Sequence, residues 1–175
     1  SQRTAVLPSN DLLQLAIEDA QNQHFNKAIK KISKITKSKA GSVTKAKALS
    51  LHGAILISMK QFDKAISVLK RALALDPSDQ IVLTHLASCY RQEGNLETSI
   101  SLAREAVGFG HRHFWANMEL ALALMTQKHF DEAMQYFVEC SEIDAAQLDP
   151  YLNLGDIHLK EGRPHEAIKA YDCLL

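Results

Sequence analysis

Small side chains recur along the chain at an interval of 34 residues, in three series that follow one another within each unit. A side chain no larger than alanine lets two helix backbones approach closely, so these positions mark where paired helices are expected to touch. The series consist of Gly53, Ala87, Ala121 and Gly155; of Ala65, Ser99, Ala133 and Ala167; and of Ala72, Ala106, Cys140 and Leu174.

Short polar segments separate the first series from the second, which lies 12 residues further on. These segments are residues 60–61, 94–95, 128–129 and 162–164. Twelve residues interrupted by a polar reversal are too short for one straight helix. An acidic residue such as Asp63 follows the reversal, where a carboxylate suits the positive end of a helix. Each unit is therefore predicted to be a helix, a turn and a second helix.

A divergent unit precedes the regular ones. Ala16 and Ala28 show the same offset of 12, but the spacing to the next unit is three residues too long. The excess lies in the polar segment 37–42, which is typical of a connector. The predicted organisation is an N-terminal tail (1–8), a divergent repeat with its connector (9–45), three repeats (46–79, 80–113 and 114–147) and an incomplete repeat (148–175), in one domain.

This pattern resembles the tetratricopeptide repeat, whose eight signature positions are Trp, Leu, Gly, Tyr, Ala, Phe, Ala and Pro in that order. The resemblance covers about residues 9–175, and His52 and His158 depart from it at positions that are usually apolar. It implies an all-α, right-handed superhelical solenoid of antiparallel helix pairs, with about five repeats of which the last is incomplete. In the second unit the signature positions are Leu49, His52, Gly53, Leu56, Ala65, Leu69, Ala72 and Pro77.

Composition and motifs favour neither catalysis nor nucleic-acid binding. Lys plus Arg and Asp plus Glu each number 20, so the chain lacks the basic excess of most nucleic-acid-binding proteins. No apolar stretch reaches the length of about 18 residues that a membrane span needs. Known phosphate-binding, nucleophile and metalloprotease motifs are absent, and His111 and His113 have no third metal ligand nearby. We therefore expect no enzyme activity, no cofactor and no metal.

The three cysteines are Cys89, Cys140 and Cys173, and no two of them have the spacing of a metal or redox motif. We expect buried free thiols in a reducing compartment, and hence a cytoplasmic protein. A targeting segment could still belong to a longer chain of which this one is a part.

The resemblance implies that the first helix of each unit lines a concave, partner-binding face. The segment 114–125 is apolar on nearly all sides, and only the stripe through Leu120, Ala121 and Leu124 is needed for packing between repeats. Its other stripe either holds a partner or packs within the chain itself. By register, the residues expected on the concave face are Leu13, Ile17, Lys47, Ile57, Ile81, Arg91, Trp115, Met118, Leu122, Met125, Leu152 and Asp156.

The favoured function is a protein–protein interaction module, a scaffold or adaptor that binds a peptide or helix of another protein through this apolar stripe. Two alternatives remain. The chain could be the non-catalytic repeat region of a larger enzyme such as a sulfotransferase or glycosyltransferase. It could also self-associate through its C-terminal end, because Leu175 falls inside the second helix of the last unit and no polar cap follows.

Overall fold

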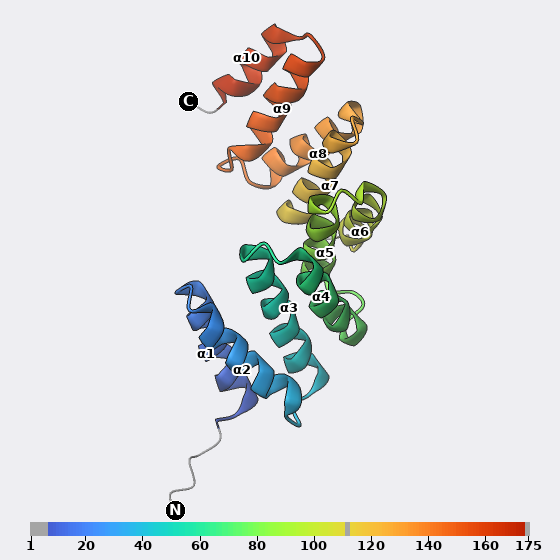
Figure 1. Ribbon diagram of the computed structural model, residues 1–175. Helices are drawn as coiled ribbons and strands as arrows, with labels where there is room; N and C mark the ends of the chain where they lie inside the picture. The colour runs from blue at the N-terminus through green and yellow to red at the C-terminus, as the bar shows by residue number, and fades with distance from the viewer. Residues whose placement is uncertain (1–6, 111–112, 174–175) are drawn as a thin grey trace, which may run out of the picture. The chain divides into compact units, whose positions relative to one another are not determined.

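The computed structural model describes residues 7–110 and 113–173, and in this part the chain forms ten helices and no strand (Figure 1). The predicted all-α fold of helix pairs is thereby confirmed. His111, Leu174 and Leu175, named above, lie outside the described residues. The helices are α1 (Ser9–Gln21), α2 (Phe25–Lys37), α3 (Ser42–Ser58), α4 (Phe62–Leu75), α5 (Gln80–Gln92), α6 (Leu96–Gly108), α7 (Phe114–Thr126), α8 (Phe130–Ile143), α9 (Asp149–Lys160) and α10 (Pro164–Asp172).

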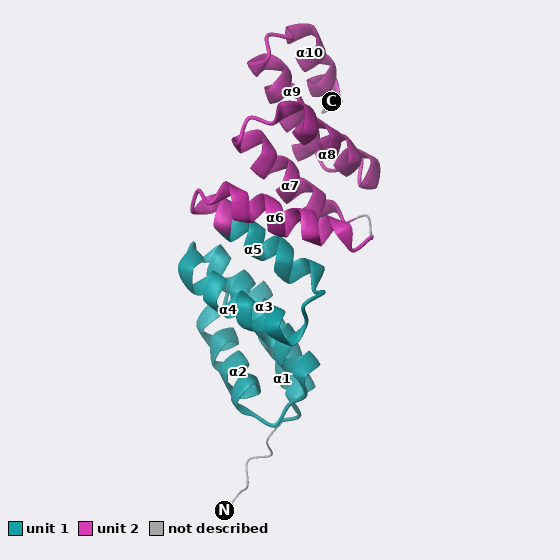
Figure 2. Cartoon of the chain, turned by 90° about the vertical axis from the view of Figure 1, so that its right-hand side faces the viewer, with its two compact units in different colours: residues 1–89 teal, residues 90–175 magenta. Residues whose placement is uncertain are grey.

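The chain divides into two compact units, residues 1–89 and 90–175, with the boundary in the last turn of α5 (Figure 2). In the first unit α1 packs on α2, α3 packs on α4, and α3 also contacts α1 and α2. In the second unit each helix from α6 to α10 packs on the next one along the chain. One core cluster of the first unit joins α1, α2 and α3 through Leu13, Ala16, Ala28, Ile32, Ile35, Ala48 and Ile55.

One turn geometry closes all five hairpins. The second residue after the end of the first helix has a positive φ, and the amide of the next residue donates a hydrogen bond to the carbonyl five residues earlier. His129, for example, donates to Leu124 at 2.9 Å, and Arg163 donates to His158 at 2.8 Å. This bond is the mark of a Schellman motif, which satisfies carbonyls left open at a helix end. The positive-φ residues are Gln23, Lys60, Gly94, Lys128 and Gly162.

Close backbone approach explains two of the small residues. A Cβ atom built on Gly53 would lie 2.3 Å from Cδ2 of Leu69, which is fully buried on α4. A Cβ on Gly155 would lie 2.2 Å from the ring of Tyr171 on α10. Both glycines therefore admit a large side chain of the partner helix, as the small-residue pattern predicted.

The three extra residues between the divergent first repeat and the next repeat lengthen helix α3. The link between α2 and α3 covers only residues 38–41, and α3 has 17 residues where α1, α5 and α7 have 13. Ser38 organises this link, since its hydroxyl donates to the carbonyl of Ile35 at 2.7 Å and accepts from the amide of Ala40 at 3.1 Å. The insertion is thus accommodated as about one additional helical turn at the start of α3.

The cysteines only partly meet the expectation of buried free thiols. All three are free, and Cys89 and Cys140 are buried, but Cys173 is exposed beside the end of α10. Burial, with a smaller contribution from the charge of Glu139, raises the pKa of Cys140 to about 12. No helix in the described part of the chain is long and apolar enough to cross a membrane.

The glycine contacts predict opposite effects for two alanine substitutions. Gly53→Ala should lower the free energy of unfolding by about 1–3 kcal/mol, because the buried Leu69 has no room to move. Gly108→Ala should raise it by up to about 1 kcal/mol, because that helical position has nothing within 4 Å of a new Cβ. Urea denaturation measures both. Equal effects of the two substitutions would contradict the close approach at Gly53.

The half-buried His52 predicts an acid-sensitive stability. Burial, and to a lesser extent the charge of Arg71, lowers the pKa of His52 from its usual 6.5. The unfolded chain therefore binds this proton first, so stability is complete above about pH 6.5 and falls as the pH drops below it. His52→Leu should reduce the loss of melting temperature between about pH 7.5 and pH 5.5.

Arg71→Met serves as the partial control, because it removes only the smaller, Coulombic cause. It should reduce the same loss less than His52→Leu does. An unchanged pH profile for His52→Leu would show that another group controls the acid response.

Candidate partner-binding surface

Helix α7 is the most enclosed helix of the second unit. Its apolar composition has a structural reason, because eight of its residues are buried between the neighbouring helices. The helix starts at a capped end, where the amide of Ala116 donates to Nδ1 of His113 at 3.2 Å. The buried residues are Ala116, Asn117, Met118, Glu119, Leu120, Ala121, Ala123 and Leu124.

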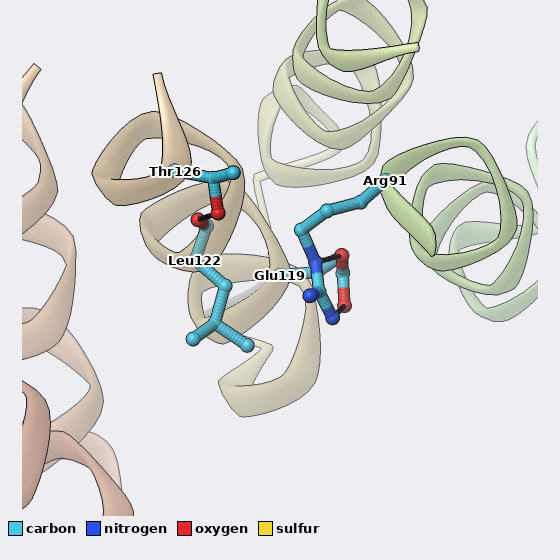
Figure 3. Close-up of polar contacts among 4 residues, drawn as sticks. All are labelled: Arg91, Glu119, Leu122 and Thr126. Carbon is cyan, nitrogen blue, oxygen red and sulfur yellow. Dashed lines mark hydrogen bonds and ion pairs between the residues drawn. The ribbon is translucent and has the colours of Figure 1, made fainter. Parts of the chain in front are cut away.

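Two of those buried residues are polar, and both are satisfied. Asn117 donates its side-chain amide to the carbonyl of His113 at 3.0 Å. Glu119 accepts two hydrogen bonds from Arg91 at the end of α5, from Nε to Oε1 at 2.5 Å and from Nη2 to Oε2 at 3.3 Å (Figure 3). The side chains of Arg91 and Glu119 are 19% and 9% exposed. This two-pronged ion pair joins the last turn of α5 to α7 within the second unit and gives the Arg91 charge an internal partner.

An apolar stripe remains accessible on one side of α7. Trp115 is 56% exposed, and its ring meets that of Phe114 edge-on at a centroid distance of 4.9 Å. Leu122 and Met125 are half-buried and follow Trp115 by seven and ten residues, so the three lie on one helix face. Figure 3 shows Leu122 one turn beyond Glu119, where its carbonyl accepts a hydrogen bond from Thr126 at 2.8 Å. We call Trp115, Leu122 and Met125 the α7 stripe.

Helix α9 carries a second, mixed face. Leu152 and Leu159 are 42% and 52% exposed, and Asp149 and Asp156 are exposed at helical spacing beside them. The Tyr171 hydroxyl donates to Oδ1 of Asp156 at 2.6 Å, which joins α10 to α9. This hydrogen bond is the main cause that raises the pKa of Tyr171. The α9 face therefore combines two leucines with two carboxylates.

The other residues predicted on the concave face differ in how exposed they are in the structure. In the first unit Lys47 is exposed, Ile81 is 51% exposed, and Ile57 is half-buried. Leu13 is buried in the core cluster and Ile17 packs against it. In the second unit Met118 is only 6% exposed. Leu13 and Met118 thus serve the packing of the chain itself. For Met118 this matches the alternative left open for the second apolar stripe of residues 114–125.

A shallow groove on the second unit was not predicted. It encloses about 400 Å³ between α6, the end of α7 and the turn before α8. Arg104 at its edge forms an ion pair with Glu132 of α8 at 2.6 Å. The groove is lined by Glu97, Ile100, Ser101, Arg104, Leu124, Gln127 and His129.

Sequence reasoning also missed the partner of Arg91. Glu119 stood inside a helix described only as apolar, although a lone carboxylate in such a helix signals an internal ion pair. The partners are 28 residues apart, so they occupy different positions of consecutive 34-residue repeats and no motif joins them. Among the described residues, no group of three His, Cys, Asp or Glu side chains is placed to hold a metal ion.

Helix pairs that repeat with one turn geometry define a helical repeat protein. Models of the tetratricopeptide repeat match residues 56–108, 116–147 and 148–172, and the chain belongs to that family.

Solved structures share the fold at low sequence identity. A crystal structure of MamA is 18% identical, with 90% of this chain and 91% of that chain covered and a TM-score of 0.77. MamA from Desulfovibrio magneticus RS-1 is 11% identical over 94% and 91% of the chains, with a TM-score of 0.80. YrrB, described as a TPR protein with an unusual peptide-binding site, is 16% identical over 95% and 84%, with a TM-score of 0.72. At these identities the likeness shows the fold alone.

The Arg91–Glu119 pair predicts a strong energetic coupling. Arg91→Met leaves a nearly buried carboxylate unpaired and should cost about 3 kcal/mol of unfolding free energy. Combining it with Glu119→Leu removes both charges, so the double variant should be more stable than Arg91→Met alone. A double-mutant cycle from urea denaturation measures the coupling. Additive single effects would mean that the pair contributes nothing to holding α5 on α7.

Proposed function

We propose that the chain is a protein-binding module that holds a segment of another protein against the α7 stripe. The observation that carries the proposal is Trp115, a large aromatic side chain that is 56% exposed beside two half-buried apolar residues on the same helix face. Tryptophan is enriched among residues that dominate binding energy at interfaces. Membership of a family of helical repeats and the printed description of YrrB as a peptide-binding relative also support a binding role.

The partner segment is proposed to be apolar with basic residues at its edge. Trp115, Leu122 and Met125 suit apolar anchors, and methionine adapts to side chains of different shape. The exposed carboxylates Asp149 and Asp156 on α9 suit Lys or Arg of the segment. Arg91 is committed to Glu119, so an acidic segment finds no matching charge at that point.

Binding rather than catalysis is the proposed role, and it rests on the family match. Leu152 and Asp156 extend the proposed surface onto α9. Lys47, Ile57 and Ile81 stay predictions for the first unit. The buried free thiols Cys89 and Cys140 fit the reducing environment of the cytoplasm, which is the proposed location.

The test uses Trp115, the only tryptophan of the chain, as its own reporter. Short peptides selected from a library for binding to the whole chain should shift the Trp115 emission to shorter wavelength, because the exposed indole becomes covered. Titration calorimetry then gives the dissociation constant. Leu122→Asp should raise that constant at least ~10-fold, since it puts a charge among apolar anchors.

The matched control is Val43→Asp, which makes the same kind of change at a residue that is 66% exposed on α3. It should leave the dissociation constant unchanged. Thermal melts verify that both variants fold, and Trp115→Ala, measured by calorimetry, replaces Leu122→Asp if that variant unfolds. Selected peptides that bind both Leu122→Asp and Trp115→Ala as well as the original chain would place the binding surface elsewhere.

A further inference from the structure

Positive charge is concentrated in one continuous segment of the first unit. Residues 22–62, which include α2, α3 and the link between them, contain nine lysines and no Asp or Glu. The rest of the chain therefore carries eleven Lys and Arg against all twenty Asp and Glu. A net charge of zero thus conceals a long segment whose formal charges are all positive.

Two side-chain contacts gather the ends of three helices at one end of the first unit. The hydroxyls of Ser9 and Ser38 lie 3.4 Å apart, which joins the start of α1 to the link after α2. The Thr44 hydroxyl donates to Oδ1 of Asn10 at 3.0 Å, which joins the start of α1 to the start of α3. Figure 1 shows the start of α1, the end of α2 and the start of α3 at this same end.

Four exposed lysines accompany these contacts. Lys37 is the last residue of α2, and Lys39 lies in the link that follows it. Lys34 lies about one helical turn before Lys37, and Lys47 lies in the second turn of α3. Within the described part of the chain, no hydrogen bond or ion pair holds any of these four ammonium groups. Asp11 is the one acidic residue in the first turn of α1, so positive charge prevails at this end.

Two apolar side chains are exposed at the same end. Val43, in the first turn of α3, is 66% exposed, which is the largest exposed fraction among the large apolar side chains of the described chain. Leu7, two residues before α1, is 50% exposed. Their chain neighbours Thr44 and Ser9 make the two contacts described above, so both lie near the lysines. We call Lys34, Lys37, Lys39, Lys47, Val43 and Leu7 the basic end.

We propose that the basic end binds the surface of an anionic phospholipid membrane. Binding of a protein to such a surface combines attraction of cationic side chains to the headgroups with burial of apolar side chains in the interface. Lysine suits this contact, because it is a compact, flexible point charge that needs no fixed geometry. The negative excess of residues 90–175 is repelled by the same surface, so the first unit is the one that faces the membrane.

Other polyanions use only part of the basic end. Nucleic-acid recognition favours arginine, which binds phosphate bidentately, and single strands also stack on aromatic side chains. The basic end contains neither arginine nor an aromatic residue. An acidic peptide would be attracted by the lysines, but its charged groups give Val43 and Leu7 no apolar environment. The combination of lysines with exposed apolar side chains therefore favours a bilayer.

Sedimentation with large lipid vesicles is the first measurement. The intact chain should bind vesicles of equimolar phosphatidylserine and phosphatidylcholine, and it should bind vesicles of pure phosphatidylcholine at least ~10-fold more weakly. Binding to the anionic vesicles should also weaken at least ~10-fold between about 20 mM and about 500 mM salt, because the lysine charges become screened. Equal binding to both lipids, or none to the anionic vesicles at low salt, overturns the proposal.

Neutralising three lysines tests the position of the surface. Lys34→Gln/Lys37→Gln/Lys39→Gln should weaken binding to the anionic vesicles at least ~10-fold, because each lysine near the surface contributes about fivefold. The measurement is made at about 100 mM salt, where the screening length is about 10 Å. Thermal melts verify folding, and Lys37→Gln/Lys39→Gln/Lys47→Gln replaces the first variant if that one unfolds.

The matched control is Lys27→Gln/Lys60→Gln/Lys64→Gln. It removes the same charge from the same unit, at the opposite end of the helices, beside the hairpin turns. Its binding should stay within ~3-fold of that of the original chain, because those charges lie more than a screening length away. An equal loss in both triple variants would assign the effect to the overall charge of the unit and contradict the basic end.

Val43 distinguishes a bilayer from a soluble polyanion. Val43→Ser should weaken binding to the anionic vesicles about 3-fold, since less apolar surface enters the interface. Met59→Ser, at a 38% exposed residue beyond the other end of α3, should leave it unchanged. Tighter binding to polyglutamate or to an oligonucleotide duplex than to the vesicles, with no effect of Val43→Ser, overturns the proposal. The α7 stripe is unchanged in all variants, so peptide binding there is measured independently.

Discussion

The contact between the two helices of a hairpin is the constraint on which the remaining structure depends. At Gly53 and Gly155 a side chain of the second helix occupies the space that a Cβ atom would need. This contact fixes the distance between the helices, and the turn that joins them must then reverse the chain within a few residues. The repeated bond of the Schellman type at a positive-φ residue provides that reversal in all five hairpins. Gln23, Lys60 and Lys128 adopt this conformation without being glycine, although the left-handed region is unfavourable for residues with a Cβ atom.

The same packing decides which apolar side chains remain available to a partner. A helix that is enclosed by its neighbours must be apolar on most sides for structural reasons alone, and α7 is such a helix. Met118 is therefore absorbed into the interior, and the Arg91–Glu119 pair occupies another side of α7. What is left is the narrower stripe of Trp115, Leu122 and Met125. The proposed binding surface is thus limited to the apolar side chains that helix packing leaves exposed or half-buried.

The positive and negative charges of the chain are separated between its two units: residues 1–89 carry a positive excess and residues 90–175 a negative one. Several positive charges on α2 and several negative charges on α8 create local potentials that a total of zero does not describe. Such potentials act over about 10 Å at moderate ionic strength. A partner or a second copy therefore encounters a basic or an acidic surface according to which unit it approaches.

Much of the fold was determined by the sequence alone, because the 34-residue spacing of small residues reflects local helix geometry and contacts between neighbours in the chain. The hairpins and their turns could be predicted in this way, whereas the three extra residues, expected in the connector 37–42, lengthen α3 instead. The division of charge was also present in the sequence, and counting by halves would have found it. Two things required the tertiary structure: the burial of Leu13 and Met118, and the pairing of Arg91 with Glu119. Each depends on which neighbouring helix covers a side chain, and that contact joins residues of different helices whose separation carries no signal in a single sequence.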